Sequence, residues 1–468
     1  MTPIWAITRL TIREGLRMRI VLVFVIAMVF IVLRLPFALT GDDTVAGRLQ
    51  TFLDYSMSAV SILLSLATIF LACATLTSEF KTNTLHLVVT KPVTRFQVLV
   101  GKWLGIFLLN ALLLVLCGFA IYGLALFIRE RPETFRRDRL KVRDVLWTAR
   151  AAAKPVTPDF RTTAEQDIQK RVEEGALAND ERTRALAVRE RIRTYESDWR
   201  IIRPNEAQVY EFQNLPEPER SDTALQVRFR AKSIPIAQDE VVRVGWVFLD
   251  PDTEGFLHEP FFTVERITDF HEFLINARSA VRAGRAKLLV INQFDPDNRY
   301  SIHFEGDDSL QIFYRVGGFE QNFVKALAIL QMRLSFLAGV GLFFSTFVSF
   351  PIACMGAFLF ILIGVGKPWW YESIGANIDV EFARATPSAD PLGKYGIAIR
   401  MVLIPVLDFV FPDFSALNGV PKLVEGVNID HQLVQRTTLH TLLFGIALLI
   451  GPGWLFFSRR EVAEVQVQ

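Results

Sequence analysis

The sequence predicts an α-helical polytopic membrane protein, with about six transmembrane helices and an inserted soluble α+β domain that contains an antiparallel β-sandwich. Three observations support this prediction. The 468 residues are 51% hydrophobic and yet 21% charged, and the two kinds of residue are separated along the chain, as in membrane spans that flank a soluble module. Apolar runs long enough to cross a bilayer occur towards both ends. Between them, alternating apolar and polar residues are typical of half-buried strands.

Bulk charge and cysteine content exclude several function classes. The net charge is only +2, so we expect no nucleic-acid partner. The three cysteines, Cys73, Cys117 and Cys354, all fall in apolar runs. The soluble stretches therefore hold neither a disulfide framework nor a thiolate metal site. No signal-peptide cleavage pattern follows the first apolar run, which we interpret as a retained span.

Residues 1–128 predict an N-terminal helix and three spans. Residues 3–19 have helical apolar spacing and four arginines, which favours an amphipathic helix in the headgroup layer; an ordinary solvated helix is the alternative. A bilayer core of roughly 30 Å needs about 20 apolar residues in a helix. Residues 20–39, 57–76 and 103–128 meet this requirement.

Residues 323–468 predict three further spans. The fourth and fifth lie within residues 326–365, with a turn at Ser345–Pro351, and the last covers 439–457. Gln331 and Arg333 then sit in the first turns of the fourth span. Residues 397–411 are apolar but contain charges and a proline, so we interpret them as a re-entrant or interfacial segment on the outer face rather than a seventh span.

Residues 129–322 form the predicted insertion. Residues 160–200 are rich in Glu, Arg, Ala and Gln, which favours a helical stalk. Residues 205–320 alternate with period two between turns such as Asp250-Pro251-Asp252, which predicts the β-sandwich; a short helix is expected at 267–281. The histidines show no metal-ligand spacing and no nucleophile elbow occurs. We therefore expect no catalytic residue, cofactor or metal in this domain.

Basic residues in short connections set the orientation. They gather in the N-terminal arm, in the connection at 78–102 and in the C-terminal tail. This predicts a protein of the plasma membrane, the inner membrane of a bacterium. Both termini lie on its cytoplasmic side, and the insertion is extracytoplasmic. The basic run at 129–143 opposes this orientation, but long translocated domains largely escape the rule.

The connection at 78–102 is the most informative segment for function. A helix-breaking Lys91-Pro92 at its centre predicts two short helices that meet at a bend. Gly101 and Gly105, four residues apart, allow another helix to approach closely. From composition alone, a basic loop that only sets the topology remains an alternative to a coupling role.

An ordered pattern in this connection resembles the ABC-2 type transporter permeases, and most closely the branch of gliding-motility and nitrous-oxide-reductase-maturation permeases. The pattern consists of Glu79, Thr84-Leu85, Leu87, Thr90-Lys91-Pro92-Val93, Arg95 and Gly101-Lys102. Seven of these positions matter most here: Glu79, Thr84, Lys91, Pro92, Arg95, Gly101 and Lys102. The resemblance extends over the six-span framework, including the turn at 345–351, but not over the insertion. It implies that these seven residues couple the chain to a cytoplasmic ATPase subunit, and that permeases pair as homo- or heterodimers in the bilayer.

The resulting hypothesis is the permease subunit of an ATP-driven ABC transporter, an exporter. The chain lacks a phosphate-binding loop, since Gly366-Lys367 is followed by Pro368, so a separate subunit must hydrolyse ATP. The alternative is a non-transporting envelope scaffold whose β-domain binds a partner. A transporter driven by an ion gradient needs ionisable groups deep in the spans, whereas only Arg34 and Arg333, both expected near span ends, are present.

Overall fold

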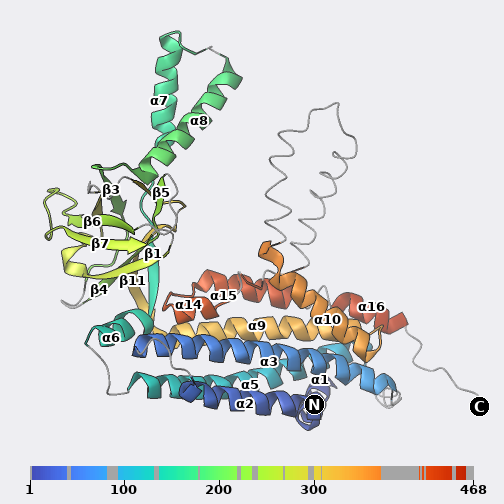
Figure 1. Ribbon diagram of the computed structural model, residues 1–468. Helices are drawn as coiled ribbons and strands as arrows, with labels where there is room; N and C mark the ends of the chain where they lie inside the picture. The colour runs from blue at the N-terminus through green and yellow to red at the C-terminus, as the bar shows by residue number, and fades with distance from the viewer. Residues whose placement is uncertain are drawn as a thin grey trace, which may run out of the picture. The chain divides into compact units, whose positions relative to one another are not determined.

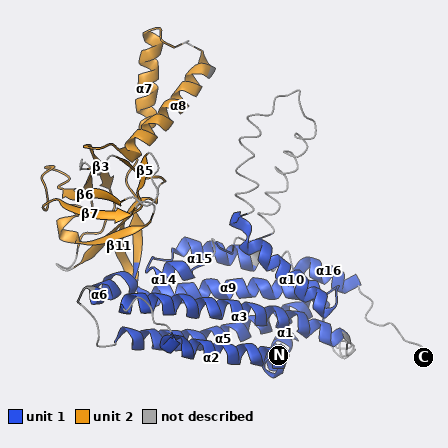
Figure 2. Ribbon diagram, in the orientation of Figure 1, with its two compact units in different colours: residues 1–149, 318–468 blue, residues 150–317 orange. Residues whose placement is uncertain are grey.

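The computed structural model describes residues 3–38, 44–81, 93–130, 136–177, 180–218, 223–234, 241–266, 269–292, 300–306, 308–369, 411, 414–415, 418–444 and 450–459. The chain divides into two compact units (Figure 2). Residues 1–149 and 318–468 form the first unit, and residues 150–317 form the second. The predicted insertion had wider limits, 129–322.

The first unit is helical. Its longer helices α2, α3, α5 and α9 lie side by side (Figure 1) and share one hydrophobic core. The described elements of this unit are α1 (Pro3–Arg17), α2 (Arg19–Ala38), α3 (Val45–Lys81), α5 (Arg95–Arg129), α6 (Arg136–Lys141), η1 (Val142–Leu146), α9 (Phe319–Ser345), α10 (Phe350–Val365), α14 (Val420–Val424), α15 (His431–Thr438), η3 (Leu439–Phe444) and α16 (Gly451–Arg459).

Four helices among the described residues are long and apolar enough to cross a membrane: α2, α3, α5 and α9. The α10 helix is apolar but shorter. The predicted turn between the fourth and fifth spans is confirmed, because α9 ends at Ser345 and α10 begins at Phe350 with Pro351 in its first turn. The predicted last span falls on η3 and α16, with residues 445–449 outside the described residues. Of the predicted re-entrant segment 397–411, only Phe411 is described.

The predicted start of the fourth span was wrong. We expected it at about residue 326, but α9 begins at Phe319, so Arg333 lies in the middle of the helix rather than in its first turn. Two polar residues near the start of α9, Asn322 and Lys325, have partners within the protein. The Asn322 amide donates to the Val427 carbonyl at 2.8 Å, and Lys325 Nζ donates to the Ile429 carbonyl at 2.9 Å. Satisfied polar groups of this kind are compatible with a buried helix.

The prediction of two short helices at the Lys91-Pro92 bend was also wrong on its C-terminal side. The chain enters α5 at Arg95 and continues without a break to Arg129. A capping box explains this start: Gln97 N donates to Thr94 Oγ1 at 3.3 Å, and Thr94 N donates to Gln97 Oε1 at 3.1 Å. Residues 82–92 lie outside the described residues.

The described strands of the second unit form three sheets, and several of these strands are labelled in Figure 1. The strands are β1 (Thr148–Ala153), β2 (Ile201–Ile202), β3 (Ala207–Phe212), β4 (Ala224–Phe229), β5 (Lys232–Ile234), β6 (Val241–Leu249), β7 (Phe261–Arg266), β8 (His271–Asn276), β9 (Ala286–Ile291), β10 (Ser301–His303) and β11 (Leu310–Gly318). Two sheets have four strands, in the orders β1-β11-β4-β8 and β3-β9-β6-β7, and a small sheet has the order β2-β10-β5. The sheets are antiparallel.

The two four-stranded sheets face each other across one hydrophobic core. The ring of Trp246, from β6, lies 4.5 Å from that of Phe229 in β4 and 5.1 Å from that of Phe273 in β8. The apolar residues of the predicted alternation in β4, Leu225, Val227 and Phe229, are all buried as expected, and Gln226 between them is buried as well. Aromatic residues that reach across from both sheets produce the layered packing of a β-sandwich.

Two other predictions for this unit have different outcomes. Residues 160–200 are helical as expected, as the packed pair α7 (Phe160–Glu173) and α8 (Glu181–Arg200). The prediction of a short helix at 267–281 was wrong. Its described part is β8 followed by the short 3₁₀ turn η2 (Ala277–Ser279), because β8 pairs along its whole length with β4, and this ladder overrides local propensity.

Candidate functional site: the elbow between α3 and α5

The elbow is defined here as the end of α3, residues 75–81, and the start of α5, residues 93–105. It brings together four of the seven residues predicted to couple the chain to an ATPase: Glu79 in α3, and Arg95, Gly101 and Lys102 in α5. The other three, Thr84, Lys91 and Pro92, lie outside the described residues. Helices α1 and α16 also pack against the elbow.

A buried ion pair joins the two sides of the elbow. The Lys102 side chain is only 2% exposed, and its Nζ donates to Glu79 Oε1 at 2.8 Å and to the Thr75 carbonyl at 3.0 Å. A lysine is almost never this buried unless it is paired. The pair therefore ties α3 to α5 at a place where either charge alone would be strongly unfavourable.

A second carboxylate, that of Glu14 in α1, lies within electrostatic range of the same ammonium. The pKa of Glu14 is raised above its usual value, mainly through desolvation by burial. The negative charge of Glu79 also raises this pKa, whereas the positive charge of Lys102 and a hydrogen bond with Ser78 lower it. Glu79 Oε2 is buried and has no hydrogen-bond partner among the described residues. The Lys102 ammonium thus pairs with Glu79 of α3 and also acts electrostatically on Glu14 of α1.

The raised pKa of Glu14 gives a pH dependence with a defined sign. A carboxyl group whose pKa is raised in the folded state favours folding below its usual pKa, and this contribution is lost as the pH rises through the raised value. We therefore expect Glu14→Gln, which mimics the protonated acid, to be more stable than the wild type near neutral pH. The difference in thermal midpoint between the two proteins should shrink as the pH falls through the raised pKa of Glu14 and vanish below the usual pKa of a glutamic acid. Glu190→Gln, at an exposed position of α8, serves as the control, and a pH-independent difference would contradict the assignment.

The glycines of the elbow let α1 approach α5 closely, as the spacing predicted. A Cβ at Gly101 would lie 2.9 Å from Ile7 Cβ, and one at Gly105 would lie 2.7 Å from Thr11 Cβ. Thr8 Oγ1 also donates to the Gly101 carbonyl at 3.2 Å. Small residues spaced four apart are a common way for helices to pack in membranes. The partner, α1, is the helix that the sequence had assigned to the headgroup layer.

Arg95 joins α5 to the end of α16. Its Nη1 donates to the carbonyls of Phe457 and Ser458, the latter at 2.9 Å, and its guanidinium lies 5.4 Å from the centre of the Phe457 ring. An arginine at the last carbonyls of a helix satisfies unpaired acceptors and suits the helix dipole. Phe457 itself is buried with Leu76, Val98 and Leu99. Four helices therefore meet at the elbow as one packed assembly.

The sequence reasoning missed Glu14, Thr8 and the end of α16. One signal for Glu14 was available, since it is the only acidic residue among residues 1–19, in a segment otherwise charged by arginines. No local signal marks Phe457 or Ser458, because their role depends on contacts with Arg95 more than 360 positions away in the chain.

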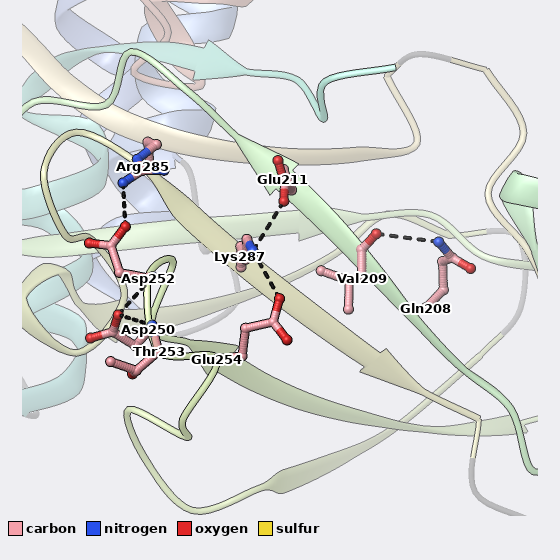
Figure 3. Close-up of polar contacts among 9 residues, drawn as sticks. All are labelled: Gln208, Val209, Glu211, Asp250, Asp252, Thr253, Glu254, Arg285 and Lys287. Atoms are coloured by element: carbon pink, nitrogen blue, oxygen red, sulfur yellow. Dashed lines mark hydrogen bonds and ion pairs between the residues drawn. The ribbon is translucent and has the colours of Figure 1, made fainter. Parts of the chain in front are cut away.

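A second group of acidic residues lies in the turn after β6 in the second unit. Asp250 Oδ1 accepts hydrogen bonds from the backbone N–H groups of Asp252 and Thr253, which lower the pKa of Asp250. The remaining acids are paired (Figure 3): Arg285 binds Asp252 at 2.7 Å.

Lys287 lies between two further carboxylates beside this turn (Figure 3). Its Nζ is 3.3 Å from Glu254 and 3.4 Å from Glu211. Among the residues that the structure describes, no group of three or more His, Cys, Asp or Glu side chains is arranged to hold a metal. The turn is therefore a paired surface network.

Comparison with known proteins gives one family. A model for the family described as ABC-2 family transporter protein matches residues 5–134. The match covers α1, α2, α3 and α5, and hence both sides of the elbow, but not residues 150–317. No curated protein and no solved structure matches the chain. Residues 5–134 are thus similar to ABC-2 family transporter proteins, and the four long apolar helices are those of a membrane protein.

Proposed function

We propose that this chain is the transmembrane permease subunit of an ATP-driven ABC exporter and that a separate cytoplasmic ATPase docks on the elbow. The observation that carries the proposal is the elbow itself. The residues that the sequence pattern assigns to coupling, Glu79, Arg95, Gly101 and Lys102, make structural contacts that link four helices. The region that matches the ABC-2 family contains all of them.

The packing of the elbow provides a way to transmit force. A push on residues 82–92 reaches α3 through Glu79 and α5 through the capped start at Thr94. Because Lys102 and Glu79 are buried against each other, the two helices move together rather than slide apart. The α5 helix runs for 35 residues without a break, so a tilt at the elbow moves its far end. This tilt would open a cavity alternately to one side of the membrane and to the other.

The energy source is proposed to be external to the chain. The Lys367 of Gly366-Lys367 is 7% exposed, and its Nζ donates to the Phe411 carbonyl at 3.1 Å. It is thus engaged inside the protein rather than placed to bind phosphate. We further propose that the permease acts as a dimer in the bacterial inner membrane. Both termini would be cytoplasmic and residues 150–317 extracytoplasmic, in accord with the basic N-terminal arm and elbow.

Co-purification tests the ATPase partner. Replacing Lys91-Pro92-Val93 by Gly-Ser-Gly leaves Thr94 and Arg95 themselves unchanged, although it removes the Val93 side chain, which packs against the cluster around Phe457. Both proteins are expressed in their native cells. We expect the variant to retain at most about one-tenth of the phosphate-binding-loop ATPase that co-purifies with the wild type. Loss of a docking motif commonly costs more than about 1.4 kcal/mol of binding free energy, which is a factor of ten in affinity. The same replacement at Glu174-Gly175-Ala176, in the turn after α7, is the matched control. Full association in the elbow variant would overturn the proposal.

A non-transporting envelope scaffold remains the second candidate. The observation in its favour is that residues 150–317 form a compact unit with a hydrophobic core of their own, so this unit is built to act as a binding module. Under this alternative no ATPase co-purifies with the wild type, while a partner is retained that depends on residues 150–317.

A further inference from the structure

A groove runs between α5 and α9 on the first unit. It has a volume of about 530 Å³ and is lined from Ala111 to Tyr122 on α5 and from Glu320 to Gln331 on α9. Gly118 forms part of its floor, because a Cβ there would lie 2.7 Å from Leu327 Cδ1. The volume is in the range of small-molecule sites. Apart from its two ends, the lining is apolar.

One end of the groove carries an organised polar cluster. Glu320 Oε1 accepts hydrogen bonds from Trp147 Nε1 at 3.1 Å and from the Tyr122 hydroxyl at 3.4 Å. The Arg129 guanidinium lies over the Trp147 ring, 4.7 Å from its centre, and is exposed. The Trp147 ring stacks on Phe319 at 4.2 Å. A hydrogen-bonded carboxylate and an exposed guanidinium thus both contact one tryptophan side chain.

The length of the groove matches one leaflet of a membrane. The 11 residue steps from Ala111 to Tyr122 correspond to about 16 Å of helix, and half of a bilayer core is roughly 15 Å. The polar cluster lies near the C-terminal end of α5, where tyrosine, tryptophan and arginine commonly mark the headgroup level. The opposite end is closed by Gln331, whose Nε2 donates to the Phe107 carbonyl at 2.9 Å.

We propose that this groove binds one acyl chain of a zwitterionic phospholipid with a primary ammonium, such as a phosphatidylethanolamine. The chain lies along the apolar floor, the ammonium binds Glu320 and the phosphate binds Arg129. The opposite charges at one end of the groove match the charges of this headgroup. The apolar lining matches the acyl chain in polarity, and its length matches one leaflet. The inference does not depend on an ATPase partner or on the direction of transport.

A second copy of the chain fits the groove less well. A helix of another copy would contact α5 along most of its length, whereas this groove ends after about 16 Å. The groove rims are also strongly exposed, with Phe119 at 74% and Val324 at 64%. Because α5 and α9 are apolar enough to cross a membrane, exposed apolar side chains on them face the hydrocarbon of the bilayer.

Photocrosslinking in vesicles tests the proposal. The full chain is reconstituted with a diazirine-labelled acyl chain on either phosphatidylethanolamine or phosphatidylglycerol, and the labelled peptides are mapped. We expect the ethanolamine lipid to label the groove about tenfold more than the glycerol lipid, the value of one charge-assisted hydrogen bond. Glu320→Gln should remove this preference and keep the labelling. Equal labelling of the wild type by both lipids would overturn the headgroup assignment.

A matched pair of substitutions tests the groove itself. Val324→Trp fills the groove, and we expect it to reduce labelling of the groove by about tenfold. Leu116→Trp is the control, since Leu116 is a 57% exposed residue of α5 outside the lining. Equal labelling in the two variants would show annular lipid only and overturn the site. Disulfide formation between two copies carrying Phe119→Cys would assign the groove to a second copy and overturn it as well.

Discussion

Replacing Lys102 with methionine is expected to destabilise the membrane unit severely. Methionine keeps most of the apolar volume of the lysine side chain but leaves Glu79 buried, 13% exposed, and without its cation. Removal of one partner of a buried ion pair commonly costs about 3–5 kcal/mol. In a unit of this size the midpoint of thermal inactivation in detergent should fall by roughly 5–10 °C.

Two further variants separate the ion pair from the loss of packing. The double variant Lys102→Met with Glu79→Gln removes both charges, and we expect it to recover at least about half of the lost midpoint, because replacement of a whole buried pair is often nearly neutral. Lys170→Met changes an exposed lysine of α7 and should leave the midpoint within about 1 °C, as is usual for surface substitutions. A Lys102→Met protein as stable as this control would show that the pair does not hold the elbow.

The sequence predicts those parts of the fold that depend on local pattern. Long apolar runs identify α2, α3, α5 and α9 because a membrane span is recognised by hydropathy alone. Period-two alternation identifies β4 and β6, because every second residue of each strand is an apolar side chain that lies in the core. The errors occur where tertiary partners decide. The start of α9 at Phe319 depends on acceptors near residues 427–429, and β8 depends on its pairing with β4.

The same distinction holds for the elbow. Glu79, Arg95, Gly101 and Lys102 are recognisable as an ordered pattern in one continuous segment. Their partners are not, because Glu14 lies 88 positions before Lys102 and Ser458 lies 363 positions after Arg95. The glycine spacing predicted a close helix neighbour but not its identity, since any helix with small contacts fits such a surface. Only the structure shows that this neighbour is α1.

Replacing Gly105 with leucine is expected to detach α1 from α5. Helix propensity alone predicts the opposite, since leucine is about 0.8 kcal/mol better than glycine within a helix. The contact should dominate, because even a Cβ at this position would lie 2.7 Å from Thr11 Cβ and 3.0 Å from the Thr8 carbonyl oxygen. Overpacking of this kind costs about 1–3 kcal/mol. Detachment also separates Glu14 from Lys102, and hydrogen exchange of residues 3–17 should accelerate by about tenfold or more.

Gly123→Leu provides the matched control on the same helix. A Cβ at Gly123 would meet nothing within 4 Å, so this variant keeps the gain in helix propensity without the collision. We expect residues 3–17 to exchange in it as in the wild type, with an unchanged or slightly higher thermal midpoint. If Gly105→Leu and Gly123→Leu protect residues 3–17 equally, α1 is not held by the glycine contact. The elbow would then have to transmit force through α3, α5 and α16 alone.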